Sequence, residues 1–66
     1  MAARKTATVN TPRGLGLNLR EAPSLDSKIL RVLPAGSSVS LDRRKKAPEG
    51  WTAVTGGGFV MTKYLE

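Results

Sequence analysis

Hydrophobic and polar residues alternate along this chain in short segments that proline and glycine separate. Prolines stand at positions 12, 23, 34 and 48, and glycines at 14, 16, 36, 50 and 56–58. The segments between them have strand length and no helical period, which predicts strands at residues 6–10, 16–21, 28–33, 38–42, 51–55 and 58–61. Residues 62–65 fit a single helical turn. This pattern predicts an all-β fold, a small and strongly bent sandwich or barrel of five to six short antiparallel strands.

The alternation within the strands predicts the core. In residues 16–21 the leucines face one way, and Asn18 and Arg20 face the other. Residues 28–33 are more continuously apolar, which is typical of a strand that is buried on much of both sides. Arg20 is expected to donate hydrogen bonds to the carbonyls of a nearby turn. The predicted core residues are Leu17, Leu19, Ile29, Leu33, Val39, Leu41 and Val54.

Composition limits the chemistry that the chain can perform. Its 66 residues allow one domain with one modest core. It contains no cysteine and no histidine, which removes disulfides, the usual zinc ligands and the side chain that most often acts as a base near neutral pH. The serines and threonines therefore have no histidine to activate them. We expect no catalytic residue, no metal site and no cofactor.

The charge of the chain indicates the sign of its partner. Eleven Lys and Arg against five Asp and Glu give a net charge of +6, which attracts polyanions such as nucleic acid, a membrane surface or an anionic wall polymer. No apolar run approaches the roughly 20 residues of a transmembrane helix, and the first five residues lack the apolar stretch of a secretory signal. We expect residues 1–5 to form a disordered tail and residues 6–65 to form the domain.

Several separated blocks of the sequence resemble the bacterial SH3 (SH3b) domain family. They are LNLREAPS at 17–24, SKIL at 27–30, LPAG at 33–36, GW at 50–51, GFV at 58–60 and KYL at 63–65. The resemblance covers about residues 6–65 in the family's order and spacing, although GFV stands where Gly-Trp-Val is common. It implies an SH3-like barrel of the kind appended to cell-wall hydrolases, phage lysins and other envelope proteins, where it targets the cell wall.

The first candidate binding surface consists of Trp51, Phe59, Met61 and Tyr64. A three-residue loop at 56–58 pairs Val54 with Val60 on the core face, so that Trp51, Ala53, Phe59 and Met61 share the outer face. A two-residue loop exchanges the two faces. We favour the first arrangement because both valines then occupy the family's inward positions. An exposed Trp–Phe–Met surface suits sugars and peptides, which pack on aromatic faces.

The second candidate surface is the basic run Arg43, Arg44, Lys45 and Lys46. Two interpretations remain open for it. The run is either a solvated loop that keeps a sheet edge from pairing or an electrostatic contact for a phosphate-bearing polymer. The sequence leaves open whether this run and the aromatic residues share one face.

These features lead to one principal hypothesis, a non-catalytic module that targets a larger envelope protein or peptidoglycan hydrolase to the cell wall. The expected partners are peptidoglycan or an anionic wall polymer and a linked catalytic domain. The expected location is the cell envelope, or outside the cell as part of a longer protein. One alternative is a small β-barrel that binds nucleic acid, although few aromatic residues stand among the basic ones. Another is a domain that packs against a larger enzyme and regulates it. We expect a monomer.

Overall fold

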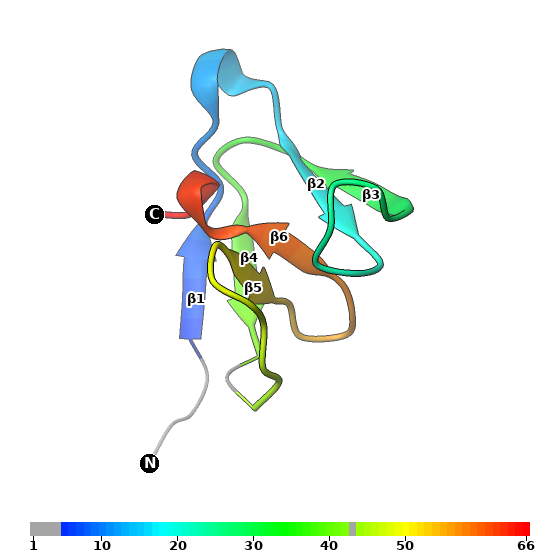
Figure 1. The fold of residues 1–66 in the computed structure, drawn as a ribbon. Coiled ribbons are helices and arrows are strands. Elements are labelled where there is room, and N and C mark those ends of the chain that lie inside the picture. The colour runs from blue at the N-terminus through cyan, green and yellow to red at the C-terminus, as the bar shows by residue number, and fades with distance from the viewer. Residues whose placement is uncertain (1–4, 43) are drawn as a thin grey trace.

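The computed structural model describes residues 5–42 and 44–66, which form six β-strands and two short 3₁₀ helices (Figure 1). The elements are β1 (Lys5–Thr8), η1 (Pro12–Gly14), β2 (Leu17–Arg20), β3 (Ile29–Leu33), β4 (Ser38–Leu41), β5 (Trp51–Ala53), β6 (Phe59–Met61) and η2 (Thr62–Tyr64). The prediction of an all-β fold is confirmed, and η2 is the predicted helical turn. The tail predicted for residues 1–5 lies outside the described residues except for Lys5, where β1 begins.

The strands form two antiparallel sheets that are joined into a small SH3-like barrel. One sheet pairs β1 with β4, and the other has the order β3-β2-β6-β5. The bridges Leu41↔Val54 and Val9↔Leu65 join segments from the two parts. Close to the second bridge, the backbones of Thr8 and Glu66 exchange hydrogen bonds of 3.0 and 2.8 Å. The end of β1 and the end of the described chain therefore lie together (Figure 1).

The core lies between the two sheets and consists of aliphatic side chains. Val60 is 0% exposed and Val9 is 1% exposed, and partly buried Leu41 packs against the cluster. The predicted core residues are confirmed with one exception, which is described below. The buried cluster contains Val9, Leu17, Leu19, Leu33, Val39, Val54 and Val60.

Strand β3 is far more exposed than its apolar sequence indicates. Ile29, Leu30 and Val32 keep 44, 47 and 56% of their surface exposed, and Leu33 is the buried residue of the strand. The prediction that this strand is buried on much of both sides is wrong, as is the core position of Ile29. The reason is topological, because β3 stands at the edge of its sheet and pairs with β2 alone.

The β5–β6 hairpin has a register two residues away from the predicted one. Ala53 pairs with Phe59, and the Val54 amide donates to the Gly58 carbonyl at 2.9 Å. The loop therefore comprises residues 55–57 instead of 56–58, and Val60 lies opposite Thr52. A shift of two residues preserves the side-chain alternation. The predicted grouping of residues on the two faces of the hairpin is therefore correct even though the pairing is not.

Candidate functional site

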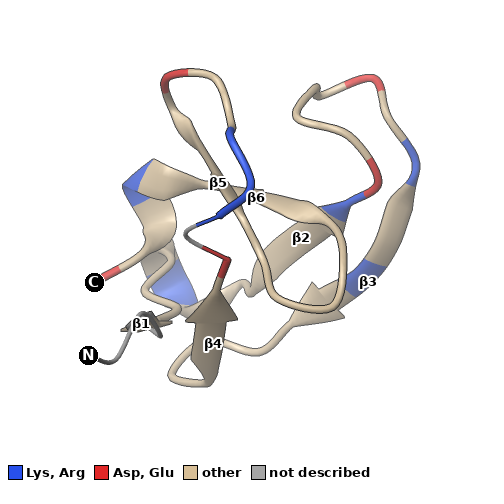
Figure 2. Ribbon diagram, turned by 90° about the horizontal axis from the view of Figure 1, so that it is seen from below, with Lys and Arg blue, Asp and Glu red and all other residues tan. Residues whose placement is uncertain are grey.

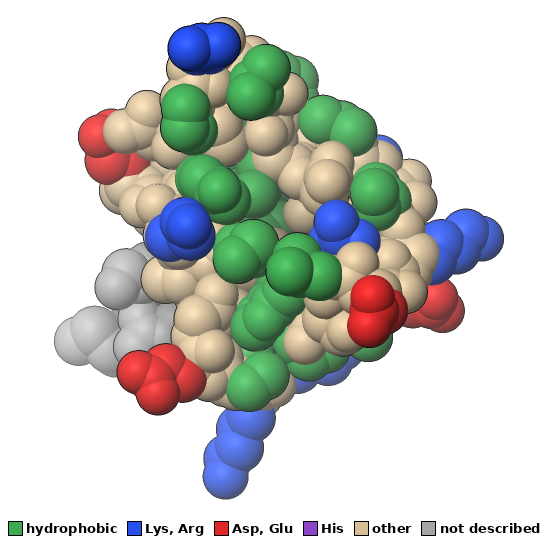
Figure 3. Space-filling view, turned by 45° about the horizontal axis from the view of Figure 1, so that its top comes forward, with side chains coloured by type: hydrophobic (Ala, Val, Ile, Leu, Met, Phe, Trp, Pro, Cys, Tyr) green, Lys and Arg blue, Asp and Glu red, His purple; other side chains and the backbone are tan. Residues whose placement is uncertain are grey.

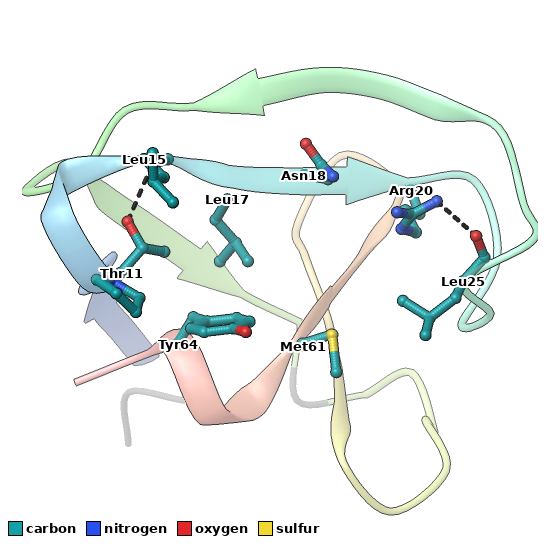
Figure 4. Close-up of a pocket in the computed structure, with 10 residues that line it drawn as sticks. Thr11, Leu15, Leu17, Asn18, Arg20, Leu25, Met61 and Tyr64 are labelled. Atoms are coloured by element: carbon teal, nitrogen blue, oxygen red, sulfur yellow. Dashed lines mark hydrogen bonds between the residues drawn. The ribbon is translucent and has the colours of Figure 1, made fainter.

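A shallow groove runs along β2, between the loop before this strand and the loop after it. We call it the β2 groove, and it has a volume of about 290 Å³. Leu15 and Leu25, which are 73 and 63% exposed, stand at its two ends. Leu17, Met61 and Tyr64 line it between them, and Figure 4 shows the Tyr64 ring below Leu17 with its hydroxyl toward Met61. The groove thus offers an extended apolar surface that no other part of the described chain covers.

Two turns hold the ends of the β2 groove in place. At one end the Gly16 amide donates to Thr11 Oγ1 at 2.9 Å, which fixes the backbone on either side of Leu15. At the other end Arg20 Nη1 donates to the carbonyls of Leu25 and Ser27 at 2.9 and 3.0 Å. The expectation that Arg20 binds turn carbonyls is confirmed. Because these bonds fix the loop that carries Leu25, Arg20 positions one wall of the groove.

Polar groups along the β2 groove can contact a ligand. Among the described residues, the Asn18 amide and the Tyr64 hydroxyl take part in none of the side-chain hydrogen bonds. The Lys63 ammonium lies 5.2 Å from the centre of the Tyr64 ring, which brings a positive charge to the same end of the site. Figure 3 shows hydrophobic side chains gathered across one face of the domain, with Lys and Arg side chains around them. This combination can hold an extended ligand that has apolar and anionic parts.

The structure separates the four predicted aromatic-surface residues. Met61 and Tyr64 line the β2 groove, whereas Trp51 is half-buried in β5 opposite Met61. Phe59 is 8% exposed, so it is not part of an open aromatic surface. The segment after β4 runs beside β5, where the Asp42 amide donates to the Ala53 carbonyl at 3.0 Å, and it then brings Lys45 over the Phe59 ring.

The basic run lies against the covered side of the β5–β6 hairpin. Arg43 is outside the described residues, and Arg44, Lys45 and Lys46 are exposed. Lys45 Nζ lies 5.1 Å from the centre of the Phe59 ring, and Figure 2 shows the basic segment passing across β5 and β6. A cation over an aromatic face contributes about 0.5–1 kcal/mol at an exposed site. Lys45 therefore packs against Phe59, while Arg44 and Lys46 are exposed to solvent.

Sequence reasoning missed the two exposed leucines at the ends of the β2 groove. Leu15 stands between Gly14 and Gly16, and the sequence pattern marks these glycines as turn residues without assigning a role to the leucine. Leu25 lies inside the loop between β2 and β3, where polar residues are usual. A large apolar side chain in a short turn, with no strand period to explain it, was the signal available in the sequence.

Comparison with known protein families identifies the fold. The sequence profile that describes the bacterial SH3 domain matches residues 15–66, which is more than half of the chain. The chain belongs to the bacterial SH3 domain family. Comparisons of this bacterial SH3 domain with curated proteins and with solved structures gave no significant match. In the described part of the domain, no helix has the length and apolar character needed to cross a membrane.

Proposed function

We propose that this bacterial SH3 domain is a non-catalytic binding module that holds a larger envelope protein or peptidoglycan hydrolase at the cell wall. The observation that carries the proposal is the β2 groove, with Leu15 and Leu25 exposed at its ends and Tyr64 between them. Family membership supports a binding role in general terms. The groove's shape and the positive charge of the domain support the cell wall as its target.

The shape of the β2 groove suits a linear ligand. A glycan strand or a stem peptide can lie along β2 with its apolar parts on Leu15, Met61 and Tyr64, since sugars and peptides pack well on aromatic faces. Hydrogen bonds to Asn18 and to the Tyr64 hydroxyl then fix its position. The net charge of +6 increases the local concentration of an anionic polymer near the groove.

Replacing Leu15 with serine tests the groove. Because Leu15 is 73% exposed, the substitution leaves the core intact. We expect the free energy of unfolding to stay within about 0.5 kcal/mol of that of the original domain. The serine variant loses the apolar area that Leu15 would bury against a ligand. We therefore expect it to bind purified sacculi about tenfold more weakly. Co-sedimentation measures the change. Val32→Ser is the matched control, because Val32 is also exposed but lies outside the groove. Equal binding by both variants and the original domain contradicts the proposed site.

The role of the basic run is tested by the double variant Arg44→Gln with Lys46→Gln. Lys45 is kept because it packs over Phe59. At low salt we expect roughly three- to tenfold weaker sedimentation with sacculi and a weaker dependence on salt, since screening acts mainly on exposed charges. Lys28→Gln with Arg31→Gln removes the same net charge elsewhere and serves as control. If both pairs lower binding equally, total charge is what matters and the run is only a solvated loop.

A further inference from the structure

The free edge of β3 is a surface, separate from the β2 groove, that can bind a partner. In the sheet order β3-β2-β6-β5, this strand pairs with β2 on one side and with no strand on the other within the described chain (Figure 1). An edge strand presents backbone N–H and C=O groups that can pair with another chain. A register shift opposite Arg20 interrupts the strand, so its regular part comprises residues 31–33.

A hollow lies directly beside this edge. We call it the edge pocket, and it has a volume of about 440 Å³ between β3, β4 and the loop of residues 55–57. Leu19 and Leu33 contribute to its apolar lining. Arg31 lines it from the edge strand, because Arg31 pairs with Leu19 and so faces the same side of the sheet. None of its lining residues also lines the β2 groove.

The polar groups of the edge pocket are suited to a carboxylate. Ser38, Ser40 and Thr55 line it together with Arg31. Among the described residues, none of the hydroxyls of these residues and no part of the Arg31 guanidinium is engaged in a side-chain hydrogen bond or ion pair. No acidic residue lines the pocket. A guanidinium free of other partners provides charge-assisted hydrogen bonds for an acidic side chain.

We propose that the free edge of β3 binds an extended polypeptide segment of a partner protein in which acidic and apolar residues alternate. Such a segment adds a strand to the sheet through backbone hydrogen bonds, and alternate side chains supply the specificity. The residue of the partner segment that lies beside Arg31 faces the edge pocket and is acidic. Its neighbours lie beside Val32, which is 56% exposed on the opposite face of the sheet, and are apolar. This surface is separate from the β2 groove and does not depend on cell-wall binding.

Charge selects this partner over a second copy of the domain. Every copy carries a net charge of +6, and β3 is flanked by Lys28 and contains Arg31 (Figure 2). Antiparallel pairing of two β3 edges brings these cations of both copies close together, and like charges across neighbouring strands are destabilising. The carboxylates of Glu21 and Asp26 lie in the loop that precedes β3, outside the edge pocket.

The test uses a short acetylated peptide in which valine and glutamate alternate. Titration into the ¹⁵N-labelled domain is expected to shift the backbone amide signals of residues 31–33, 38–40 and 55–57, while those of Leu15 and Tyr64 stay unchanged. A peptide with the same sequence and N-methylated amides on one edge is expected to bind at least tenfold more weakly, because it cannot pair as a strand. Binding of both peptides with equal affinity, shifts centred on the β2 groove, or no shifts at millimolar peptide overturns the proposal.

Charge exchange supplies the second measurement. Arg31→Glu is expected to weaken binding of the valine–glutamate peptide at least tenfold and to create binding of a valine–lysine peptide. Arg31 is exposed, so we expect the variant to fold like the original, and an unchanged urea-denaturation midpoint checks this. Failure of the cell-wall proposal leaves this result unaffected. Concentration-dependent dimerisation of the domain in analytical ultracentrifugation, accompanied by shifts of the amide signals of residues 31–33 with protein concentration, identifies a second copy as the occupant and overturns the assignment.

Discussion

Replacing Gly58 with alanine is expected to lower the free energy of unfolding by about 3 kcal/mol, since it combines backbone strain with overpacking of the core. Gly58 has φ +99°, a conformation that other residues rarely adopt. A Cβ atom at this position stands 2.6 Å from Leu19 Cδ1, 2.8 Å from Leu19 Cγ and 3.3 Å from the Arg20 carbonyl oxygen. Leu19 is 8% exposed and cannot move without disturbing the core. Urea denaturation measures the loss.

Gly57→Ala separates the two causes of this destabilisation. Gly57 has φ +117°, and a Cβ there meets no atom within 4 Å. The substitution therefore carries the backbone strain alone, and a loss of about 1–2 kcal/mol is expected. A Gly58→Ala variant no less stable than Gly57→Ala contradicts the close packing of Leu19 against the glycine.

The second large effect is expected for Arg20→Ala, which removes both hydrogen bonds to the carbonyls of Leu25 and Ser27. Hydrogen bonds from a charged donor contribute more than neutral ones, so we expect a loss of about 2 kcal/mol in the free energy of unfolding. The loop that carries Leu25 loses its anchor at the same time. Binding to sacculi is therefore expected to fall about tenfold even at temperatures where the variant remains folded.

Arg20→Lys is the control for Arg20→Ala, because it keeps the charge without the guanidinium geometry. Lysine cannot reproduce the planar donor group of arginine, so we expect a partial loss of stability and a binding defect that persists. Amide signals in the loop between β2 and β3 report whether the loop has lost its structure. Normal binding by Arg20→Ala, measured on folded protein, shows that the position of Leu25 does not matter for the ligand.

The fold was predictable because its local signals agree with one another. Proline and glycine mark the turns, and the alternation around Leu17 and Leu19 assigns the buried face of β2. Gly36 has φ +87° in the turn after Pro34, a conformation that glycine adopts without steric cost. The role of Arg20 followed from its position opposite the leucines.

The exposure of β3 and the burial of Phe59 were not predictable from local patterns. A continuous apolar run has the same sequence whether a second layer covers it or leaves it open, and for Ile29 the answer depends on the sheet order. Phe59 lies on the face of β6 opposite Val60, and it is buried because the chain returns across it between β4 and β5. Both outcomes depend on contacts between segments distant in sequence.

The candidate site was predicted only in part for the same reason. Met61 and Tyr64 were named as binding residues, and the β2 groove contains both. Leu15 and Leu25 come from two loops that meet the same strand only in the folded chain. Arg44 and Lys46 are exposed as a charged loop predicts, and their role in binding remains a prediction.

The bridge between Val9 and Leu65 has a consequence for how the domain is made. The contact that joins the end of β1 to the segment after η2 forms only when residues 64–66 are present, because Asn10 and Thr8 bind the backbones of Tyr64 and Glu66. Bringing together segments so far apart in sequence slows folding. During synthesis this contact therefore forms only after residues 64–66 have left the ribosome tunnel.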